Sequence, residues 1–329
     1  ALGWLAFREF LYVYVAISFL VVLGLALDVF VLHPVAFHLR SDFKRLPIPR
    51  VKELFRYGLW ITISGTAASM LTQIDSLMLT MLSPNSLAIT GVYSIYVYMA
   101  TVILIPNRAM ARISLPLFGR HWQEGNTQEI ARIYAKSAMV LSFAGIWIFG
   151  GIVLNERNIG LLLGEEYARH FGIMVFLGGA SLVNNAFGLN HYVLSSSARY
   201  RMDFYFNLAL ILLTVGTNYV FILQFDGLGA ALGTMLSLLV MNAVKWWYIH
   251  RWMQMNPFTW PVLAVLLWGG ACAALCWWLP ALSIWPLDIL YRSALFTLLL
   301  FGVVYHQQWV PELNKLANPY LRRLGLPTR

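Results

Sequence analysis

The chain has 329 residues, of which 60% are hydrophobic and 11% charged, and its formal net charge is +9. This composition excludes an ordinary water-soluble domain, in which about a quarter of the residues carry charge. Nine apolar stretches each approach the roughly 20 residues with which a helix crosses a hydrocarbon core of about 30 Å. We therefore expect an all-α integral membrane protein with about nine transmembrane helices, at residues 11–33, 57–82, 87–106, 137–154, 171–196, 204–224, 228–249, 260–279 and 287–305.

The positive charge is concentrated in alternate connections between these stretches. One set of connections, which runs from residues 40–56 through Lys245 to residues 315–329, holds 19 of the 23 Lys and Arg residues. The other set holds only Arg8, Arg157, Arg169 and Arg292. The positive-inside rule places the first set in the cytoplasm, so Ala1 is expected outside and Arg329 inside. Nucleic-acid binding would need a basic face on a water-soluble module, and the sequence offers none.

The start of the chain gives a further expectation about its origin. Residues 1–10 have neither the basic n-region nor the cleavage site of a signal peptide. A first helix that enters from the outside without such a signal is explained if an odd number of spans precedes it. We therefore expect the chain to be the C-terminal part of a longer, transporter-like protein.

Three parts follow one another along the chain. Residues 1–50 hold one span and a basic linker, and residues 51–256 hold six spans. The predicted external turns at 83–86 and 224–227 are so short that the helices they join must be antiparallel neighbours. Residues 257–329 hold two more spans, rich in Trp and Leu and poor in buried polar groups, and a cytoplasmic tail.

The third span is predicted to continue as a helix from Leu87 to Phe118, with Pro106 in its later half. Proline lacks the backbone N–H and clashes with the preceding turn, so a kink is expected there. In a membrane such a break is tolerated where neighbours or a wet cavity satisfy the freed carbonyl group. The kink is either incidental or a conformational hinge, and the sequence leaves both interpretations open.

Asp75 lies within an otherwise apolar span, roughly two turns from its outer end. A carboxylate in that position costs several kcal/mol unless it faces a cavity, is paired or takes up a proton. One interpretation is therefore coupling to a proton or an ion, or a hydrogen bond to a sugar. The other is a buried polar contact that ties two helices together.

Arg108 and Arg112 are four residues apart and share one helix face just after Pro106. Guanidinium groups bind phosphate through paired hydrogen bonds, which suits a pyrophosphate headgroup that enters from the inner leaflet. The alternative is that both residues are ordinary cytoplasmic anchors. Arg199 and Arg201, at the next inner turn, are interpreted as topology determinants.

A further group of polar residues lies on two later spans. Asn184, Asn190 and His191 make the span 171–196 unusually polar for a membrane helix, and Asn207 and Asn218 follow on the next one. Such residues either cross-link helices or line a wet cavity. Some of them are expected to face a cavity, although the sequence does not say which.

Two pairs of small residues are interpreted as packing contacts. Gly229 and Gly233 form a GxxxG motif, which lets two helices approach closely. Cys272 and Cys276 are four apart on one helix, where a disulfide is implausible, and a metal site would need ligands that the sequence lacks nearby.

The sequence contains no motif of an ATPase, a metalloprotease or a serine hydrolase. The longest external connection, Asn155–His170, is predicted to be a short interfacial helix and is too short to build an active site. We therefore expect a transporter without covalent chemistry, and no metal or cofactor.

Several short segments form an ordered series along the chain: Tyr57-Gly58, Gln73–Leu79, Gly91-Val92-Tyr93, Leu163–Ala168, Ser197-Ala198-Arg199 with Asn207 and Asn218, and Gly227–Ala231. In this order they resemble the C-terminal lobe of polysaccharide and lipid-linked oligosaccharide flippases, of the O-antigen flippase type. These proteins belong to the multidrug/oligosaccharidyl-lipid/polysaccharide exporter superfamily. The resemblance covers about residues 51–256.

The resemblance implies two six-helix lobes that rock around a central, often cationic cavity. Residues 51–256 would form the C-terminal lobe, and residues 1–50 the last helix of an N-terminal lobe, at 1–33, with the basic linker that follows it; the rest of that lobe would be missing here. Such proteins move polyprenyl-pyrophosphate-linked sugars across the bacterial inner membrane for surface polysaccharides such as the O-antigen of lipopolysaccharide. The chain departs from the family in Asn107-Arg108, because an apolar residue often follows the kink proline.

From these observations we expect the flipping of a lipid-linked oligosaccharide by alternating access. Phosphate contact is assigned to Arg108 and Arg112, and coupling or gating to Asp75 and Pro106, with H⁺ or Na⁺ as the candidate coupling ion. Substrate contact is assigned to the polar group of Asn184, Asn190, His191, Asn207 and Asn218. The expected partners are the lipid-linked oligosaccharide, membrane lipids, the missing lobe and other polysaccharide-assembly proteins.

Three rival functions remain. An ion-coupled multidrug exporter of the same superfamily would export hydrophobic cations through an acidic cavity, which the positive charge balance disfavours. A membrane-embedded polysaccharide polymerase or glycosyltransferase would need catalytic residues on a long external loop. A scaffold without transport activity is the third alternative.

Overall fold

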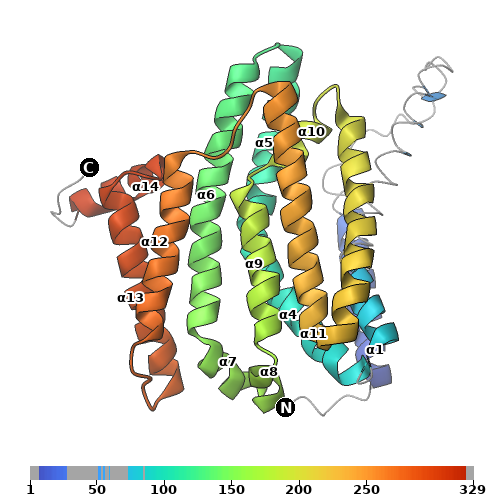
Figure 1. Ribbon diagram of the computed structural model, residues 1–329, viewed down its shortest axis with the longest axis vertical. Helices are drawn as coiled ribbons and strands as arrows, with labels where there is room; N and C mark the ends of the chain where they lie inside the picture. The colour runs from blue at the N-terminus through green and yellow to red at the C-terminus, as the bar shows by residue number, and fades with distance from the viewer. Residues whose placement is uncertain are drawn as a thin grey trace. The chain divides into compact units, whose positions relative to one another are not determined.

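The computed structural model (Figure 1) describes the following residues: 7–27, 51–52, 55, 59, 73–83 and 86–323. Most of these residues are helical and none of them is in a strand, which confirms the all-α prediction. The chain divides into two compact units, Ala1–Thr62 and Ile63–Arg329. Most of the predicted basic linker, the first part of the predicted span 57–82 and the end of the tail lie outside the described residues.

The first unit contains α1 (Phe7–Leu27), which covers most of the predicted span 11–33. Its apolar part is Tyr12–Leu25. The large apolar side chains described in this part, such as Phe19 and Val22, are exposed. An apolar helix surface of this kind marks contact with lipid or with another protein.

In the described part, four helices are long and apolar enough to cross a membrane, and a bent pair makes a fifth. The four are α6 (Thr127–Leu154), α11 (Tyr200–Met253), α12 (Trp260–Trp277) and α13 (Trp285–His306). The structure therefore supports a membrane-embedded helical protein and does not recover all nine predicted spans. Two of those spans form parts of α11, and a third is broken into two shorter helices.

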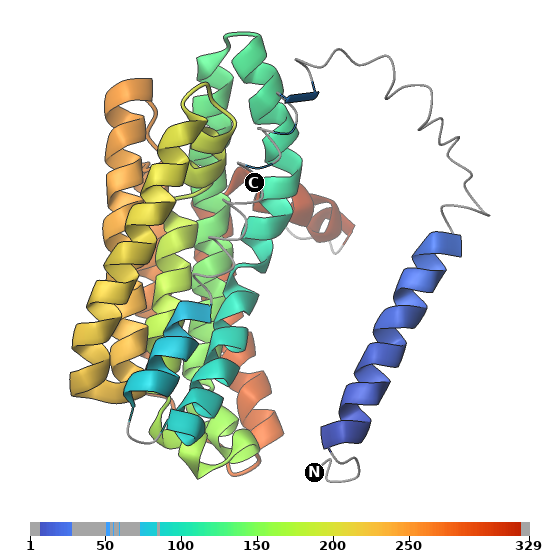
Figure 2. The same ribbon diagram turned by 90° about the vertical axis from the view of Figure 1, so that its right-hand side faces the viewer.

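α11 is a helical hairpin (Figures 1 and 2). At Asp226 the backbone leaves the helical conformation, with φ 54° and ψ −131°, within the turn predicted at 224–227. The two arms, residues 200–225 and 227–253, are joined by a hydrogen bond of 2.8 Å between the hydroxyl groups of Thr217 and Ser237. The predicted spans 204–224 and 228–249 are thus both helical, in one antiparallel pair.

The arms of α11 approach most closely at Gly229 and Gly233. A Cβ atom on Gly229 would overlap the backbone carbonyl group of Phe221, and one on Gly233 would overlap the side-chain oxygen of Asn218. Only glycine fits this spacing, so the packing role predicted for the GxxxG motif is confirmed.

The third predicted span is bent. α4 (Ser86–Ile103) and α5 (Ile105–Gln123) meet at Leu104 with an angle of 46° between Leu87–Ile103 and Ile105–Gln123. Pro106 lies in the first turn of α5, so the predicted kink is confirmed. The last carbonyl groups of a helix lack partners within it, and Asn185 Nδ2 donates to the oxygen of Ile103 at 2.8 Å. Whether the bend acts as a hinge stays a prediction.

α6 begins ten residues before the predicted span 137–154, because the side chain of Asn126 accepts a hydrogen bond from the N–H of Glu129 and caps the helix. The connection predicted as one interfacial helix contains two, α7 (Glu156–Leu163) and α8 (Glu165–Arg169). Gly164 separates them with φ 110°, a conformation that favours glycine.

The prediction of one continuous helix over 171–196 is wrong. α9 (Gly172–Ala186) and α10 (Asn190–Ser195) are separated at residues 187–189. Gly188 has φ +65° and lies against Ser137 of α6, so that a Cβ atom would approach the Ser137 hydroxyl to 2.9 Å. The break is stabilised by this contact with another helix, which the apolar pattern of the span does not reveal.

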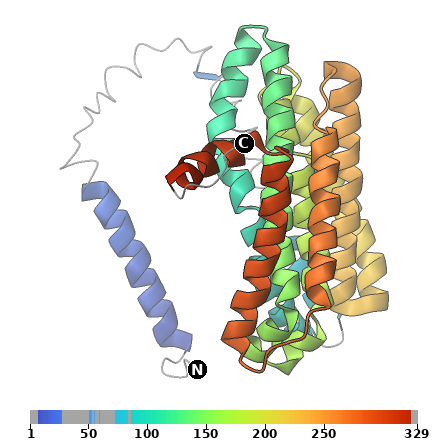
Figure 3. The same cartoon turned by 90° about the vertical axis from the view of Figure 1, so that its left-hand side faces the viewer.

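α12 and α13 pack beside α6 and are followed by α14 (Pro311–Arg323), which runs across the axis of α13 (Figure 3). Cys272 and Cys276 are free and buried in this packing, as predicted. The expectation that these helices are poor in buried polar groups holds for α12, whose buried residues are Val, Ala, Gly and Cys, and is wrong for α13. Arg292 Nε lies 3.1 Å from Asp288 Oδ2, and both residues are buried.

The apolar side chains are divided between internal cores and an apolar surface. One core joins α4, α9 and the hairpin, a second lies near the ends of α5 and α11, and a third joins α6, α12 and α13. Large apolar residues also cover the outside, and Leu223, Leu267 and Leu298 are more than half exposed. An exposed apolar surface of this extent is typical of lipid-facing helices.

Candidate functional site

Two polar sites in the interior involve the α11 hairpin. The first, here called the Asp75 cluster, consists of Asp75, Tyr93, Asn218 and Thr234. Asp75 belongs to the helical residues 73–82 and is 6% exposed. Its carboxylate accepts hydrogen bonds from Tyr93 Oη at 3.0 Å, Asn218 Nδ2 at 2.7 Å and Thr234 Oγ1 at 2.8 Å.

The three donors to Asp75 come from three different helical segments. Tyr93 lies on α4, Asn218 on the first arm of α11 and Thr234 on the second. No Lys, Arg or His of the described residues lies within ion-pair distance of Asp75. The cluster therefore ties the helices together, and it also keeps a carboxyl group in the interior whose charge no neighbouring cation balances within this part of the chain.

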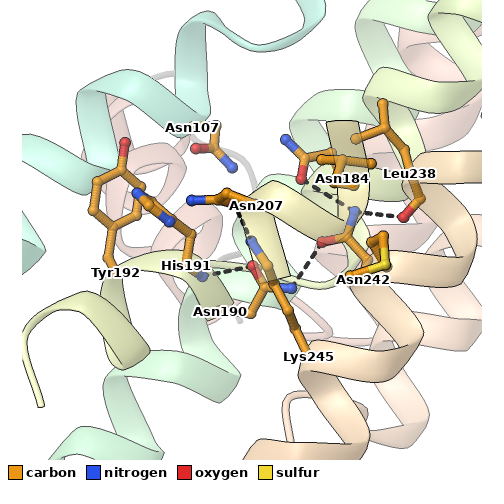
Figure 4. A pocket seen from close by; sticks show the side chains of 12 residues that line it. Asn107, Asn184, Asn190, His191, Tyr192, Asn207, Leu238, Asn242 and Lys245 are labelled. Atoms are coloured by element: carbon orange, nitrogen blue, oxygen red, sulfur yellow. Dashed lines mark hydrogen bonds between the residues drawn. The ribbon is translucent and has the colours of Figure 1, made fainter. Parts of the chain in front are cut away.

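The second site is a cavity of about 220 Å³, here called the amide pocket (Figure 4). Five asparagines line it: Asn107, Asn184, Asn190, Asn207 and Asn242. The side chains of His191, Tyr192 and Lys245 also line it. These residues come from the start of α5, the end of α9, the start of α10 and both arms of α11.

The amides of the pocket are hydrogen-bonded to one another. Asn190 Nδ2 donates to Asn242 Oδ1 at 2.8 Å. Asn242 Nδ2 in turn lies 2.9 Å from the carbonyl oxygen of Leu238 and 3.4 Å from Asn184 Oδ1. Each amide has two N–H donors and an oxygen acceptor, so the network retains capacity for a ligand or for water.

The charged groups beside the pocket neutralise one another. Lys245 Nζ donates to Asn207 Oδ1 at 2.8 Å and lies 3.4 Å from Asp203 Oδ1. His191 Nδ1 lies 2.8 Å from the carboxylate of Asp203. The side chains of Lys245 and Asp203 are 7% and 6% exposed, whereas that of His191 is 44% exposed. The pocket is therefore polar without an unbalanced buried charge.

Two helix breaks leave room for this pocket. The bend at Leu104 precedes Asn107, and the break at residues 187–189 separates Asn184 from Asn190. At the second break the backbone N–H of Leu189 donates a hydrogen bond to Ser137 Oγ at 3.3 Å. In a continuous helix this N–H would bond to a backbone carbonyl group, and here the serine takes the place of that partner. Irregular backbone at membrane depth is tolerated where protein or a water-filled cavity surrounds it.

The structure brings together four of the residues predicted to contact substrate, because Asn184, Asn190, His191 and Asn207 all line the amide pocket. It places the fifth, Asn218, in the Asp75 cluster instead. Arg108 and Arg112 are exposed on α5 and do not line the pocket, although the neighbouring Asn107 does. Pro106 lies at the bend, next to Asn107.

The sequence interpretation missed four polar residues at this site: Asn107, Asp203, Asn242 and Lys245. Lys245 was counted among the cytoplasmic charges, but it is buried beside Asp203. A usable signal existed, because Asp203 and Asn207 are four residues apart, and Asn242 and Lys245 three apart, on one helix face each.

Comparison of the chain with protein-family models, with curated proteins and with solved structures finds no match.

Proposed function

We propose that this protein moves a polyprenyl-pyrophosphate-linked oligosaccharide across the bacterial inner membrane by alternating access, in the biosynthesis of a surface polysaccharide such as an O-antigen. The observation that carries the proposal is the amide pocket, an asparagine-lined cavity inside an apolar helical bundle. The chain would act as a transporter and not as an enzyme.

The amide pocket suits a sugar for a physical reason. Sugar hydroxyl groups cannot enter hydrocarbon unaided, because they lose their hydrogen bonds to water. Asparagine amides both donate and accept, and so they replace that water without adding charge. The cavity of about 220 Å³ lies below the 300–1,000 Å³ of typical small-molecule sites, so in this conformation it holds only part of an oligosaccharide.

The remaining residues are assigned to the other parts of the cycle. Asp75 contacts both arms of α11 and α4, so loss or gain of a proton or a small cation there would change how these helices pack. Arg108 and Arg112 are exposed and carry the positive charge that a pyrophosphate group needs. The bend at Leu104 would act as the hinge between the two conformations. In this proposal the basic end of the bundle faces the cytoplasm.

A second candidate function, an ion-coupled multidrug exporter, is favoured by one observation. Asp75 is a buried carboxyl group without a cationic partner among the described residues. The amide pocket favours the sugar carrier over this alternative, because Asp203 is already paired with Lys245 and leaves no free anion for a hydrophobic cation.

Substitution of the pocket asparagines tests the proposal. The natural full-length gene is returned to a strain that lacks it, carrying either Asn190→Ala or Asn242→Ala, and surface polysaccharide is measured with the level of lipid-linked precursor. We expect loss of the polymer and accumulation of the precursor, since both substitutions break the amide network.

Asn314→Ala is the matched control, because Asn314 is also a buried asparagine with one hydrogen bond to a carbonyl group, but it lies on α14 away from the pocket. It should leave polymer export unchanged. Wild-type export by both pocket variants, at normal protein level in the membrane, would refute the sugar assignment.

A further inference from the structure

A second cavity lies at the basic end of the bundle, at the top in Figure 1, outside both polar sites. Its volume is about 500 Å³, and it is here called the basic pocket. Three parts of the chain form it: the turn between α5 and α6, the connection between α10 and α11, and the last turn of α11. Two of its lining residues are arginines, Arg199 and Arg251.

Both arginines are positioned on the same aromatic ring. The guanidinium carbon of Arg199 lies 5.2 Å from the ring centre of Trp252, and that of Arg251 lies 5.5 Å from it. Arg199 Nη1 also donates to Tyr248 Oη at 3.2 Å. Cation–π contacts of this kind hold a guanidinium group in place while leaving most of its N–H donors available.

These two positive charges have no acidic partner in the part of the chain that the structure describes. Arg120 and Arg132, at the same end of the bundle, are by contrast each paired with a glutamate at 2.7 Å. Guanidinium groups that line one pocket without a carboxylate partner are stabilised by an anion that accepts their N–H hydrogen bonds. The basic pocket therefore offers guanidinium N–H donors to an anionic group.

The rest of the lining indicates what carries that negative group. Thr127, Ser197 and Gln254 supply neutral hydrogen-bonding side chains, whereas Trp122, Met253 and Met255 supply apolar surface. The indole N–H of Trp122 has no hydrogen-bond partner among the described residues. A soluble ion needs no apolar wall, but the headgroup of a lipid does, because its glycerol and upper acyl chain follow the phosphate.

We infer that the basic pocket binds the phosphate headgroup of an anionic membrane lipid. The guanidinium groups of Arg199 and Arg251 contact the phosphate oxygens, and the Trp and Met side chains contact the glycerol end. Basic pockets at the cytoplasmic ends of membrane helices are suited to such headgroups. Exposed tryptophans nearby, Trp247 and Trp260, place this end of the bundle at the level of the headgroups.

The bound lipid would add a further link between three segments that already pack together in the second apolar core and through Arg199 and Tyr248. Trp122 lies in the last turn of α5, Arg199 directly precedes α11 and Arg251 lies in its last turn. The inference is independent of the proposed transport activity, because it concerns a cavity that shares no lining residue with the amide pocket.

The test measures lipid binding directly. The full-length protein is placed in phosphatidylcholine nanodiscs with increasing phosphatidylglycerol, and retained phosphatidylglycerol is counted by native mass spectrometry. We expect Arg199→Gln with Arg251→Gln to weaken retention about tenfold or more, as the loss of charge-assisted hydrogen bonds predicts. Unchanged retention by this variant would overturn the inference.

Three further variants separate a built site from a merely basic surface. Arg201→Gln removes the same charge two residues from Arg199, but Arg201 contacts Tyr200 and does not line the pocket, so retention should stay at the wild-type level. Trp252→Leu keeps both charges but removes the ring that holds them, and it should weaken retention, with recovery in Trp252→Phe. Equal weakening by Arg201→Gln would overturn the inference.

Competition with inorganic phosphate distinguishes a lipid headgroup from free phosphate, since both present the same phosphate oxygens to the arginines. Added at millimolar concentration to wild-type protein, it should not displace phosphatidylglycerol, since it lacks the apolar contacts. Complete displacement would identify a site for soluble phosphate and refute the lipid assignment. Melting temperatures in pure phosphatidylcholine nanodiscs, expected to be equal for all variants, exclude misfolding as the cause of lost binding.

Discussion

The Asp75 cluster and the amide pocket lie on the same two arms of α11, yet one is closed and the other open. In the Asp75 cluster three donors converge on one carboxylate that is 6% exposed. In the amide pocket five asparagines surround about 220 Å³ of space. Polar residues in a membrane helix therefore do not by themselves indicate a cavity, because the neighbouring backbone decides whether space remains between the helices.

That backbone differs in a simple way between the two regions. Near Asp75 the arms touch through Gly229 and Gly233, where an added Cβ atom would overlap the opposite arm. Near the amide pocket both neighbouring segments are broken, one at Leu104 and one at residues 187–189. Four variants compare the two regions, and the last of them lies outside both sites.

The largest effect on stability is expected for Asp75→Ala. It leaves the side chains of Tyr93, Asn218 and Thr234 buried without their acceptor, and each unpaired buried group costs about 1–3 kcal/mol. The free energy of unfolding in detergent should fall by about 3 kcal/mol or more. Asp75→Asn keeps the shape of the side chain and one acceptor oxygen, so it should lower the free energy of unfolding clearly less than Asp75→Ala does. If Asp75→Ala lowered it by the same amount as Asp75→Asn or by less, the three donors would not depend on the carboxylate as a closed site requires.

The next largest effect is expected for Gly188→Ala, at the break beside the amide pocket. Its φ of +65° strains any other residue by about 1–3 kcal/mol, and the new Cβ atom would also press on Ser137. Thermal unfolding should reveal this loss. Gly216→Ala, on the first arm of α11 where nothing lies within 4 Å of an added Cβ atom, should be neutral or slightly stabilising. Equal melting temperatures for the two variants would contradict the role of Gly188.

A smaller effect, about 1 kcal/mol, is expected for Asn242→Ala. The pocket can admit water, which replaces part of the hydrogen bonding that Asn190 and Asn184 lose. Stability would then change little, while export would be lost as proposed above. A cost as large as that of Asp75→Ala would mean that the pocket is closed and dry, like the Asp75 cluster.

The smallest effect on stability is expected for Arg108→Ala combined with Arg112→Ala, because both side chains are exposed and lie outside both sites. Unfolding should change by less than about 0.5 kcal/mol. Export should nevertheless fall if these arginines contact the pyrophosphate group. Unchanged polymer export at a normal protein level would refute the phosphate assignment.

Several features were predictable because local chemistry determines them. The turn at 224–227, the kink at Pro106 and the glycine contact of α11 follow from the local sequence: a short polar break between two apolar runs, a proline without an N–H group, and glycines without a side chain. The buried position of Asp75 could also be anticipated, since a lone carboxyl group in an apolar span must find partners. The identity of those partners could not.

Other features depend on contacts between distant segments, which hydropathy does not encode. The break at Gly188 depends on Ser137, which lies 51 positions earlier in the chain. Lys245 and Arg292 were interpreted as boundary charges, although each lies buried against an aspartate. A charge near a helix end is read as an anchor by the positive-inside rule, and only its three-dimensional neighbours show that it faces inward.

The hairpin of α11 has one further mechanical consequence. Near the turn its arms are held together by backbone packing at Gly229 and Gly233, whereas at their far ends side chains join them, through Lys245 with Asn207 and Asp203 and through Phe206 with Tyr248. The Asp75 carboxylate accepts hydrogen bonds from Asn218 on one arm and from Thr234 on the other. Separation of the two arms at this level would therefore break one of these two hydrogen bonds.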